Sequence, residues 1–192
     1  SESFLKQSLK ILKDKVFANK SIKKYENIIC FFCADPKSQE FHSKIRQEIN
    51  DNNLIEKYND LCLKIISDNI LKSNVNDNKV VIVNTSFTNS YLGEYDLDKY
   101  SVINYYGDSL SKHISNAYEL CKIFADKIVM CVSDVPELNH NHINECIKQL
   151  NKFDTYLISS DNGSVCCFST RLKTLTNELS KITFNISTTK DN

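Results

Sequence analysis

Two aspartates stand where a carboxylate could do chemistry, each directly after an apolar run. Asp134 ends the run 128–132 and precedes Pro136 by two residues. A carboxylate held at the tip of a buried strand can bind a divalent cation that also contacts the phosphates of a nucleotide. A short acid at this place can instead cap the helix that follows. Both interpretations of Asp134 remain open from these residues alone.

The second acid, Asp161, lies in the segment 159–164, between two β-like runs and directly before Asn162 and Gly163. An acid at the end of a strand is a candidate ligand-binding group. Asn-Gly is also the strongest short signal of a β-hairpin turn. A plain hairpin is therefore the alternative interpretation of this segment.

Two further segments offer groups that suit phosphate. Gly107 and Asp108 precede a helix pattern, and the free backbone N–H groups at a helix start can bind a phosphate. A capped helix N-terminus explains the same residues equally well. Lys44 and Arg46 follow the first apolar run and would neutralise phosphate charge, with a solvated helix face as the alternative.

Cysteine and histidine spacing does not predict a structural metal site. Cys30 and Cys33 have CxxC spacing but lie in a predicted strand, where side chains three apart point to opposite faces. His140 and His142 stand in a polar helix start with no other such ligand at zinc spacing.

Apolar runs that alternate with amphipathic helices must position these side chains. Buried strands are predicted at 28–32, 80–83, 101–105 and 128–132, and shorter ones at 154–159 and 164–168. Helices are predicted at 38–50, 54–72, 107–124, 139–150 and 172–179. This alternation predicts a Rossmann-like α/β fold with a mostly parallel sheet covered on both faces. Ligands of such sheets bind outside the carboxyl ends of the strands, where all four segments lie.

The domain organisation and compartment follow from length, charge and cysteine usage. Residues 1–24 carry the pattern of an added amphipathic helix, and 25–192 form one α/β domain. Equal numbers of acidic and basic residues, 24 of each, argue against nucleic acid or a membrane surface as partner. We expect neither a signal peptide nor a membrane span. Cysteines inside apolar runs favour a reducing, cytoplasmic environment.

In their order along residues 27–187, these segments resemble small bacterial glycosyltransferase-like proteins of the GT-A fold, relatives of guanylyltransferases acting on molybdopterin and 2-phospholactate. Segment 131–138 is similar to that family's G-x-D-x-P-x-L motif, and segment 161–168 to its D-G-G-Y-Y-L-L-G motif. Segments 32–36 and 44–46 resemble the family's F-A-K-x-P and K-T-R-L motifs on the phosphate side. Segment 107–114 resembles its G-D-L-G-x-R-M motif, also on the phosphate side.

The resemblance implies a three-layer sandwich of the nucleotide-diphospho-sugar transferase type that binds a nucleotide or nucleotide sugar. It implies Mg²⁺ or Mn²⁺ at Asp134 and a catalytic, acceptor-side acid at Asp161. Phosphate-binding residues would be Lys44, Arg46, Gly107 and Asp108. The activity would be that of a metal-dependent glycosyltransferase or nucleotidyltransferase.

Departures from the family pattern keep a second hypothesis open. The family lysine falls on Ala34, and the paired glycines are reduced to Gly163. Glycine lets a backbone approach a ligand closely. The alternative is a catalytically degenerate relative that serves as a protein-interaction or dimerisation module, with a homodimer as one form.

Overall fold

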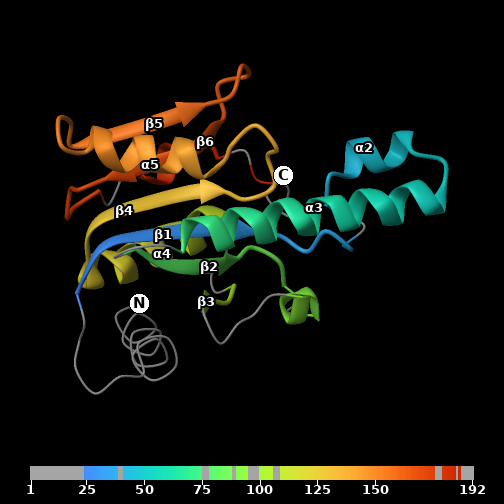
Figure 1. The fold of residues 1–192 in the computed structure, drawn as a ribbon, viewed down its shortest axis with the longest axis horizontal. Coiled ribbons are helices and arrows are strands. Elements are labelled where there is room, and N and C mark those ends of the chain that lie inside the picture. The colour runs from blue at the N-terminus through green and yellow to red at the C-terminus, as the bar shows by residue number, and fades with distance from the viewer. Residues whose placement is uncertain are drawn as a thin grey trace.

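A six-stranded sheet forms the centre of the molecule, with its strands in the order β3-β2-β1-β4-β6-β5 (Figure 1). The computed structural model describes residues 24–38, 41–74, 78–87, 90–94, 100–105, 109–175, 179–184 and 186. The strands are β1 Tyr25–Cys33, β2 Asn78–Asn84, β3 Ser101–Ile103, β4 Ala125–Val132, β5 Thr155–Ser159 and β6 Val165–Thr170. β1 to β4 are mutually parallel, and β6 runs antiparallel to both β4 and β5.

The central strands are apolar because both of their faces are covered. Seven consecutive residues of β1, from Asn27 to Cys33, are buried. Phe32 pairs with Val132 of β4, and Cys33 with Asn84 of β2, so the three strands end nearly level. The predicted opposite orientation of the CxxC pair is confirmed, since Cys30 and Cys33 belong to different core clusters.

Helices lie on both faces of the sheet (Figure 1). Their bounds are α2 Ser43–Glu48, α3 Asn52–Ser73, α4 Leu110–Phe124 and α5 His140–Gln149, with the short 3₁₀ turns η1 Ser90–Glu94 and η2 Leu179–Lys181. α3 and α5 pack on one face and α4 packs on the other, each with its own apolar cluster. The predicted three-layer fold with a mostly parallel sheet is confirmed.

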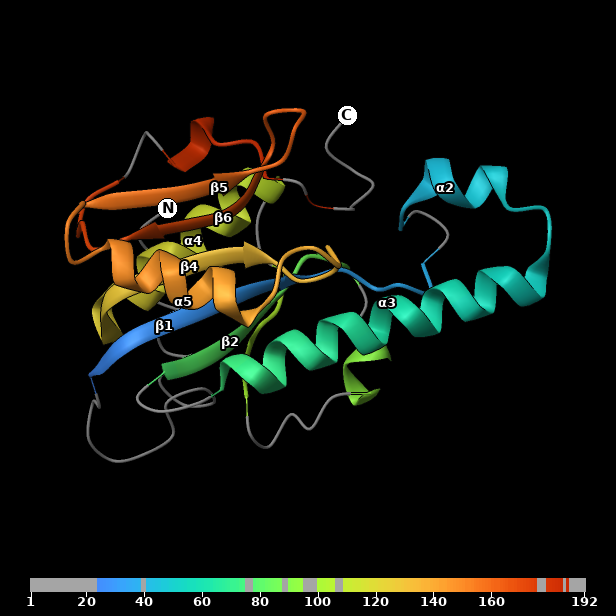
Figure 2. The ribbon, with the colours of Figure 1, turned by 45° about the horizontal axis from the view of Figure 1, so that its top comes forward.

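The outer end of α3 and the short helix α2 form an arm beyond the carboxyl edge of the sheet (Figure 2). The inner face of α3 consists of Cys62, Leu63, Ile66 and Ile70, which are buried. Leu54 and Leu61 of the same helix are exposed.

Two predicted helices differ in the structure. The helix predicted at 38–50 is confined to Ser43–Glu48. The prediction at 172–179 is wrong over residues 172–175, which form no helix. There the Leu172 carbonyl accepts a hydrogen bond from Tyr118 Oη at 2.7 Å, and Leu175 packs into the α4-side core. Tertiary contacts have replaced helical hydrogen bonding in this segment.

The predicted N-terminal helix falls almost wholly within residues 1–23, which lie outside the described residues. Its packing and the domain boundary at residue 24 therefore stay predictions. Among the residues the structure describes, no helix has both the length and the apolar character needed to cross a bilayer.

Candidate functional site

Asp134 is fixed at the tip of β4 by the residue before it. Ser133 Oγ donates to the Phe32 carbonyl at 2.7 Å, and the Ser133 carbonyl accepts from Asn69 Nδ2 at 3.0 Å. These bonds fasten the strand tip between β1 and α3. The Asp134 side chain is only 8% exposed. The carboxylate of Asp134 is thus buried at the carboxyl edge of the sheet, as predicted from the sequence.

The interpretation of Asp134 as a helix cap is wrong. α5 begins after Asn139, whose Oδ1 accepts from the backbone N–H of Asn141 at 2.9 Å. His142 Nδ1 accepts in return from the backbone N–H of Asn139 at 3.2 Å. Because this capping box satisfies the helix start, the carboxylate of Asp134 is left for another role.

One oxygen of Asp134 is buried without a hydrogen-bond partner. His42 Nε2 lies 2.9 Å from Oδ2 of Asp134, yet the contact lacks hydrogen-bond geometry and Oδ2 accepts no hydrogen bond from any described group. Leaving a buried carboxylate oxygen unsatisfied is costly. A bound cation would satisfy it.

His42 reaches Asp134 from the arm. It directly precedes α2 with φ 49° and ψ 44°, the left-handed conformation. Its ring packs on the buried Phe41 with centroids 4.1 Å apart, and its Nδ1 contacts the hydroxyl of Tyr58 on α3. Burial, then the neighbouring Cys62 and Asp134, raise the pKa of Tyr58. His42 was not predicted from the sequence, because no spacing rule links it to Asp134.

The two predicted cations of the arm differ in their surroundings. Arg46 Nη1 donates to the Pro36 carbonyl at 3.1 Å and to Asn59 Oδ1 at 2.9 Å. Arg46 therefore ties the loop after β1 to both helices of the arm, and its charge acts against the rise in the pKa of Tyr58. Lys44 is exposed on α2. Of these two cations, Arg46 is engaged in hydrogen bonds within the protein, and the Lys44 side chain is exposed.

Asp161 lies on the turn of the β5–β6 hairpin, at the same edge of the sheet as Asp134. The turn is closed by the Ser160 N–H donating to the Ser164 carbonyl at 2.8 Å, and Gly163 has φ 84°. The hairpin interpretation of this segment is correct. Asp161 is itself exposed and faces a neighbouring pocket.

That pocket, of about 550 Å³, separates the hairpin from the loop after β4. Its lining residues are Val135, Glu137, Leu138, His142, Ile158, Ser159, Ser160, Asp161, Asn162 and Cys166. Two carboxylates, two hydroxyls and an amide face it, and no lysine or arginine is among these described residues. The lining of the pocket includes Asp161 and Val135, the residue after Asp134. The two predicted acids therefore lie at the same edge of the sheet.

The remaining predicted residues, Gly107 and Asp108, lie outside the described residues. The next residue, Ser109, caps α4, and its Oγ accepts from the backbone N–H of Lys112 at 3.2 Å. The helix start predicted here is confirmed. Phosphate binding by Gly107 and Asp108 stays a prediction.

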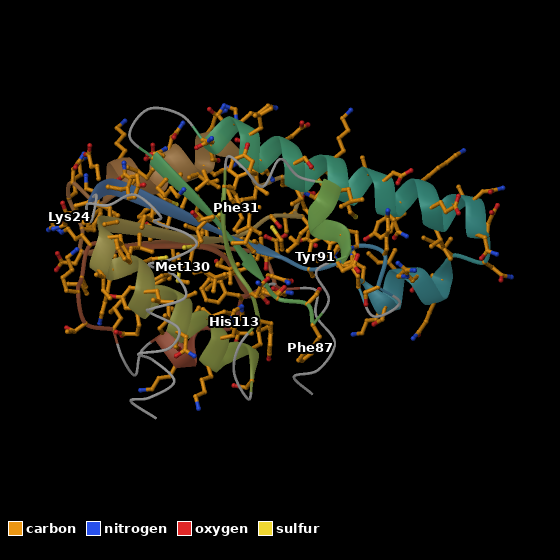
Figure 3. The ribbon with its side chains drawn as sticks, turned by 90° about the horizontal axis from the view of Figure 1, so that it is seen from below. Lys24, Phe31, Phe87, Tyr91, His113 and Met130 are labelled. Atoms are coloured by element: carbon orange, nitrogen blue, oxygen red, sulfur yellow. The ribbon has the colours of Figure 1, made fainter. Side chains whose placement is uncertain are left out.

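A second polar region, which was not predicted from the sequence, surrounds the end of β2 (Figure 3). Tyr91 Oη donates to the Cys33 carbonyl at 2.6 Å and lies 2.9 Å from Asn84 Oδ1. His113 Nε2 lies 2.9 Å from the Asn84 carbonyl. The rings of Phe87, Tyr105 and His113 follow one another with centroids 4.5 and 4.8 Å apart.

The sequence matches no known family model, and no curated protein matches it. Solved structures do match. A candidate nucleotide-diphospho-sugar transferase from Desulfovibrio desulfuricans G20 superposes with TM-score 0.69 at 14% identity, over 85% of this chain and 71% of that one. This chain has the nucleotide-diphospho-sugar transferase fold.

Two mycobacterial structures share the nucleotide-diphospho-sugar transferase fold of this chain more distantly. Rv0371c from Mycobacterium tuberculosis H37Rv, solved as a complex with manganese, has TM-score 0.54 and 11% identity over 85% of this chain and 79% of that one. Its homolog from Mycobacterium sp. strain JC1 has TM-score 0.54 and 11% identity over 83% and 76%. The family resemblance drawn from the motifs is confirmed at the level of fold.

Proposed function

We propose that the protein binds a nucleotide or nucleotide sugar with a divalent cation at the carboxyl edge of the sheet, and transfers a sugar or nucleotidyl group to an acceptor. The observation that carries this proposal is the buried Asp134, whose Oδ2 accepts no hydrogen bond from the described residues. In open α/β sheets this edge is where ligands bind.

The donor set fits a cation that is shared with the ligand. Within the described ranges no group of three or more His, Cys, Asp and Glu side chains could hold a metal ion. Asp134 would therefore supply one carboxylate, and phosphate oxygens and water most of the other positions, as is usual for Mg²⁺ and Mn²⁺. The manganese complex of Rv0371c, which has the same fold, supports this choice.

Each remaining residue has a role that its position allows. When bound, the cation neutralises charge on the phosphates of the donor. Lys44, exposed on α2, would add a positive charge at the same edge. Asp161 would orient or deprotonate an acceptor hydroxyl held in the pocket between its hairpin and the loop after β4. Gly107 and Asp108 would contact the phosphates.

The arm supports a second candidate function, that of a protein-interaction module. Arg46 is committed to Pro36 and Asn59, which leaves Lys44 as the exposed one of the two predicted cations. The apolar side chains of Ile45, Leu54 and Leu61 are all about half exposed on the same arm. An apolar surface of this kind is typical of a site that binds a partner or a second copy of the chain.

Calorimetric titration tests the proposed function. The protein is titrated with UDP-, GDP- and CDP-linked ligands in the presence and absence of Mn²⁺, together with the variant Asp134→Asn. We expect micromolar binding that requires Mn²⁺ and is lost in the variant.

The matched control is Asp154→Asn. Asp154 is exposed, pairs with Arg171 at 2.8 Å, and precedes β5 at the opposite end of the sheet. The substitution Asp154→Asn removes the same negative charge at a site far from Asp134. No binding across the panel, or equal loss in both variants, would refute the cation role of Asp134 and favour the interaction module.

A further inference from the structure

Asp134 and His42 come from distant parts of the chain and meet at one point on the carboxyl edge. Both are shielded, with exposed side-chain fractions of 8% for Asp134 and 20% for His42. The carboxylate comes from the rigid tip of β4, and the imidazole from the junction between β1 and the arm. Two groups of this kind are among the ligands that divalent transition metals use in proteins.

Their spacing fits two neighbouring ligands of one cation. The distance between Nε2 and Oδ2 is 2.9 Å. In an octahedron with bonds of about 2.1 Å, adjacent ligand atoms stand about 3.0 Å apart. A direct hydrogen bond has a similar length, but this contact lacks its geometry, and Oδ2 has no hydrogen-bond partner in the described structure. This spacing is compatible with two neighbouring ligands of one cation.

The other nitrogen of His42 is held as a metal-bound imidazole requires. His42 Nδ1 contacts the Tyr58 hydroxyl. When the Tyr58 oxygen accepts from Nδ1–H, the imidazole is the tautomer that keeps a lone pair on Nε2.

The backbone of His42 is constrained for this placement. It is the sole non-glycine residue with positive φ in the described part of the chain. Such a conformation persists where the surroundings fix it, and it concentrates at functional sites. Here the ring stacks on Phe41, which is 2% exposed, while Arg46 ties the following helix in place.

We propose that His42 is the second protein ligand of the divalent cation, beside Asp134, and that this nitrogen and oxygen pair selects a transition metal ion such as Mn²⁺ over Mg²⁺. The proposal rests on the cation role of Asp134 stated above. Imidazole is a ligand of transition metals, whereas Mg²⁺ prefers oxygen. Tyr58 is a positioning residue that sets the tautomer of His42.

The test uses Mn²⁺ alone and Mn²⁺ with inorganic pyrophosphate as the phosphate probe. Binding is measured from the loss of the free Mn²⁺ signal in electron paramagnetic resonance, and pulsed spectra report any nitrogen bound to the ion. We expect a nitrogen coupling in the wild type that disappears in His42→Asn, which tolerates the same backbone conformation. Mn²⁺ affinity should fall at least tenfold and Mg²⁺ affinity less than threefold.

His140→Ala serves as the matched histidine control, and it should retain both the coupling and the affinity. A wild-type spectrum without nitrogen coupling, or an unchanged or higher Mn²⁺ affinity in His42→Asn, would overturn the role of His42. If Asp134→Asn still abolishes Mn²⁺ binding in that case, the proposed cation site stands alone. Absence of Mn²⁺ binding in the wild type with pyrophosphate would overturn both.

Discussion

The interior of the sheet and the arm beyond its edge are built on different principles. β1, β2 and β4 consist mainly of apolar residues whose buried side chains pack between the helix layers and make few specific polar contacts. The arm has a small apolar cluster of Ala34, Phe41 and Cys62, supported by specific polar contacts of His42 and Arg46. The sheet interior therefore holds most of the buried apolar side chains, whereas the arm holds His42 beside Asp134.

The largest effect should come from the sheet interior. Phe31 is fully buried at the centre of β1. Phe31→Ala should lower the free energy of unfolding by about 3–5 kcal/mol, because it leaves a cavity that the layered core cannot fill. Urea unfolding followed by circular dichroism measures this. Leu61→Ala, on an exposed site of α3, should change it by less than about 0.5 kcal/mol, and a similar loss in both would contradict the comparison.

A smaller loss is expected from the polar support of the arm. Arg46→Ala removes two hydrogen bonds and leaves the Pro36 carbonyl and Asn59 Oδ1 to water, so we expect a cost of about 1–2 kcal/mol. Hydrogen exchange should rise in α2 and in the first turns of α3 while the strands stay protected. Lys44→Ala on the same helix provides the control, with no change expected in exchange.

Thiol labelling compares the two regions within one molecule. Burial raises the pKa of Cys33 to about 12 and that of Cys62 to about 11. At pH 8 both are protonated, so alkylation requires opening. Cys62 in the arm should react at least tenfold faster than Cys33 in β1, as mass spectrometry of peptides would show. Equal rates would mean that arm and sheet open together.

The smallest effect is the alkaline pH dependence. A folded-state pKa above the unfolded value of 9.0 means that the contribution to stability is complete below pH 9 and is lost as pH rises toward the folded value. Stability should therefore decline above pH 9, and less steeply in Cys33→Ala. Urea midpoints at pH 8, 9.5 and 10.5 measure the slope, and parallel slopes in wild type and variant would rule out this origin.

Most of the sheet could be predicted from the sequence, because continuous apolar runs such as those ending at Cys33 and Val132 must be buried on both faces of a sheet. The position of Asp134 followed from the same logic. The helix predicted at 172–179 is wrong over residues 172–175, where Tyr118 of α4 donates to the Leu172 carbonyl and Leu175 packs into the core on that side. Periodicity does not distinguish a helix from an irregular segment held by tertiary contacts.

The partner of Asp134 could not be predicted. His42 approaches it only because Phe41, Tyr58 and Arg46 fix the path of the arm, and these contacts leave no regular pattern in the sequence. Asn139 took the capping role that Asp134 was also suited for, since the chain makes a turn between Val135 and Leu138 before α5 begins. Both outcomes depend on chain geometry over long distances.

The most direct test of the account is the thermal unfolding of wild type and Asp134→Asn with and without Mn²⁺ and a nucleotide diphosphate. Without ligand, the variant should be at least as stable as wild type, because it lacks a buried and unsatisfied carboxylate oxygen. At about a hundredfold excess of ligand over Kd, the Tm of wild type should rise by about 5–10 °C and that of the variant should not move. An equal rise in both proteins, or no rise in wild type, would contradict the assignment of Asp134 as the cation-binding residue.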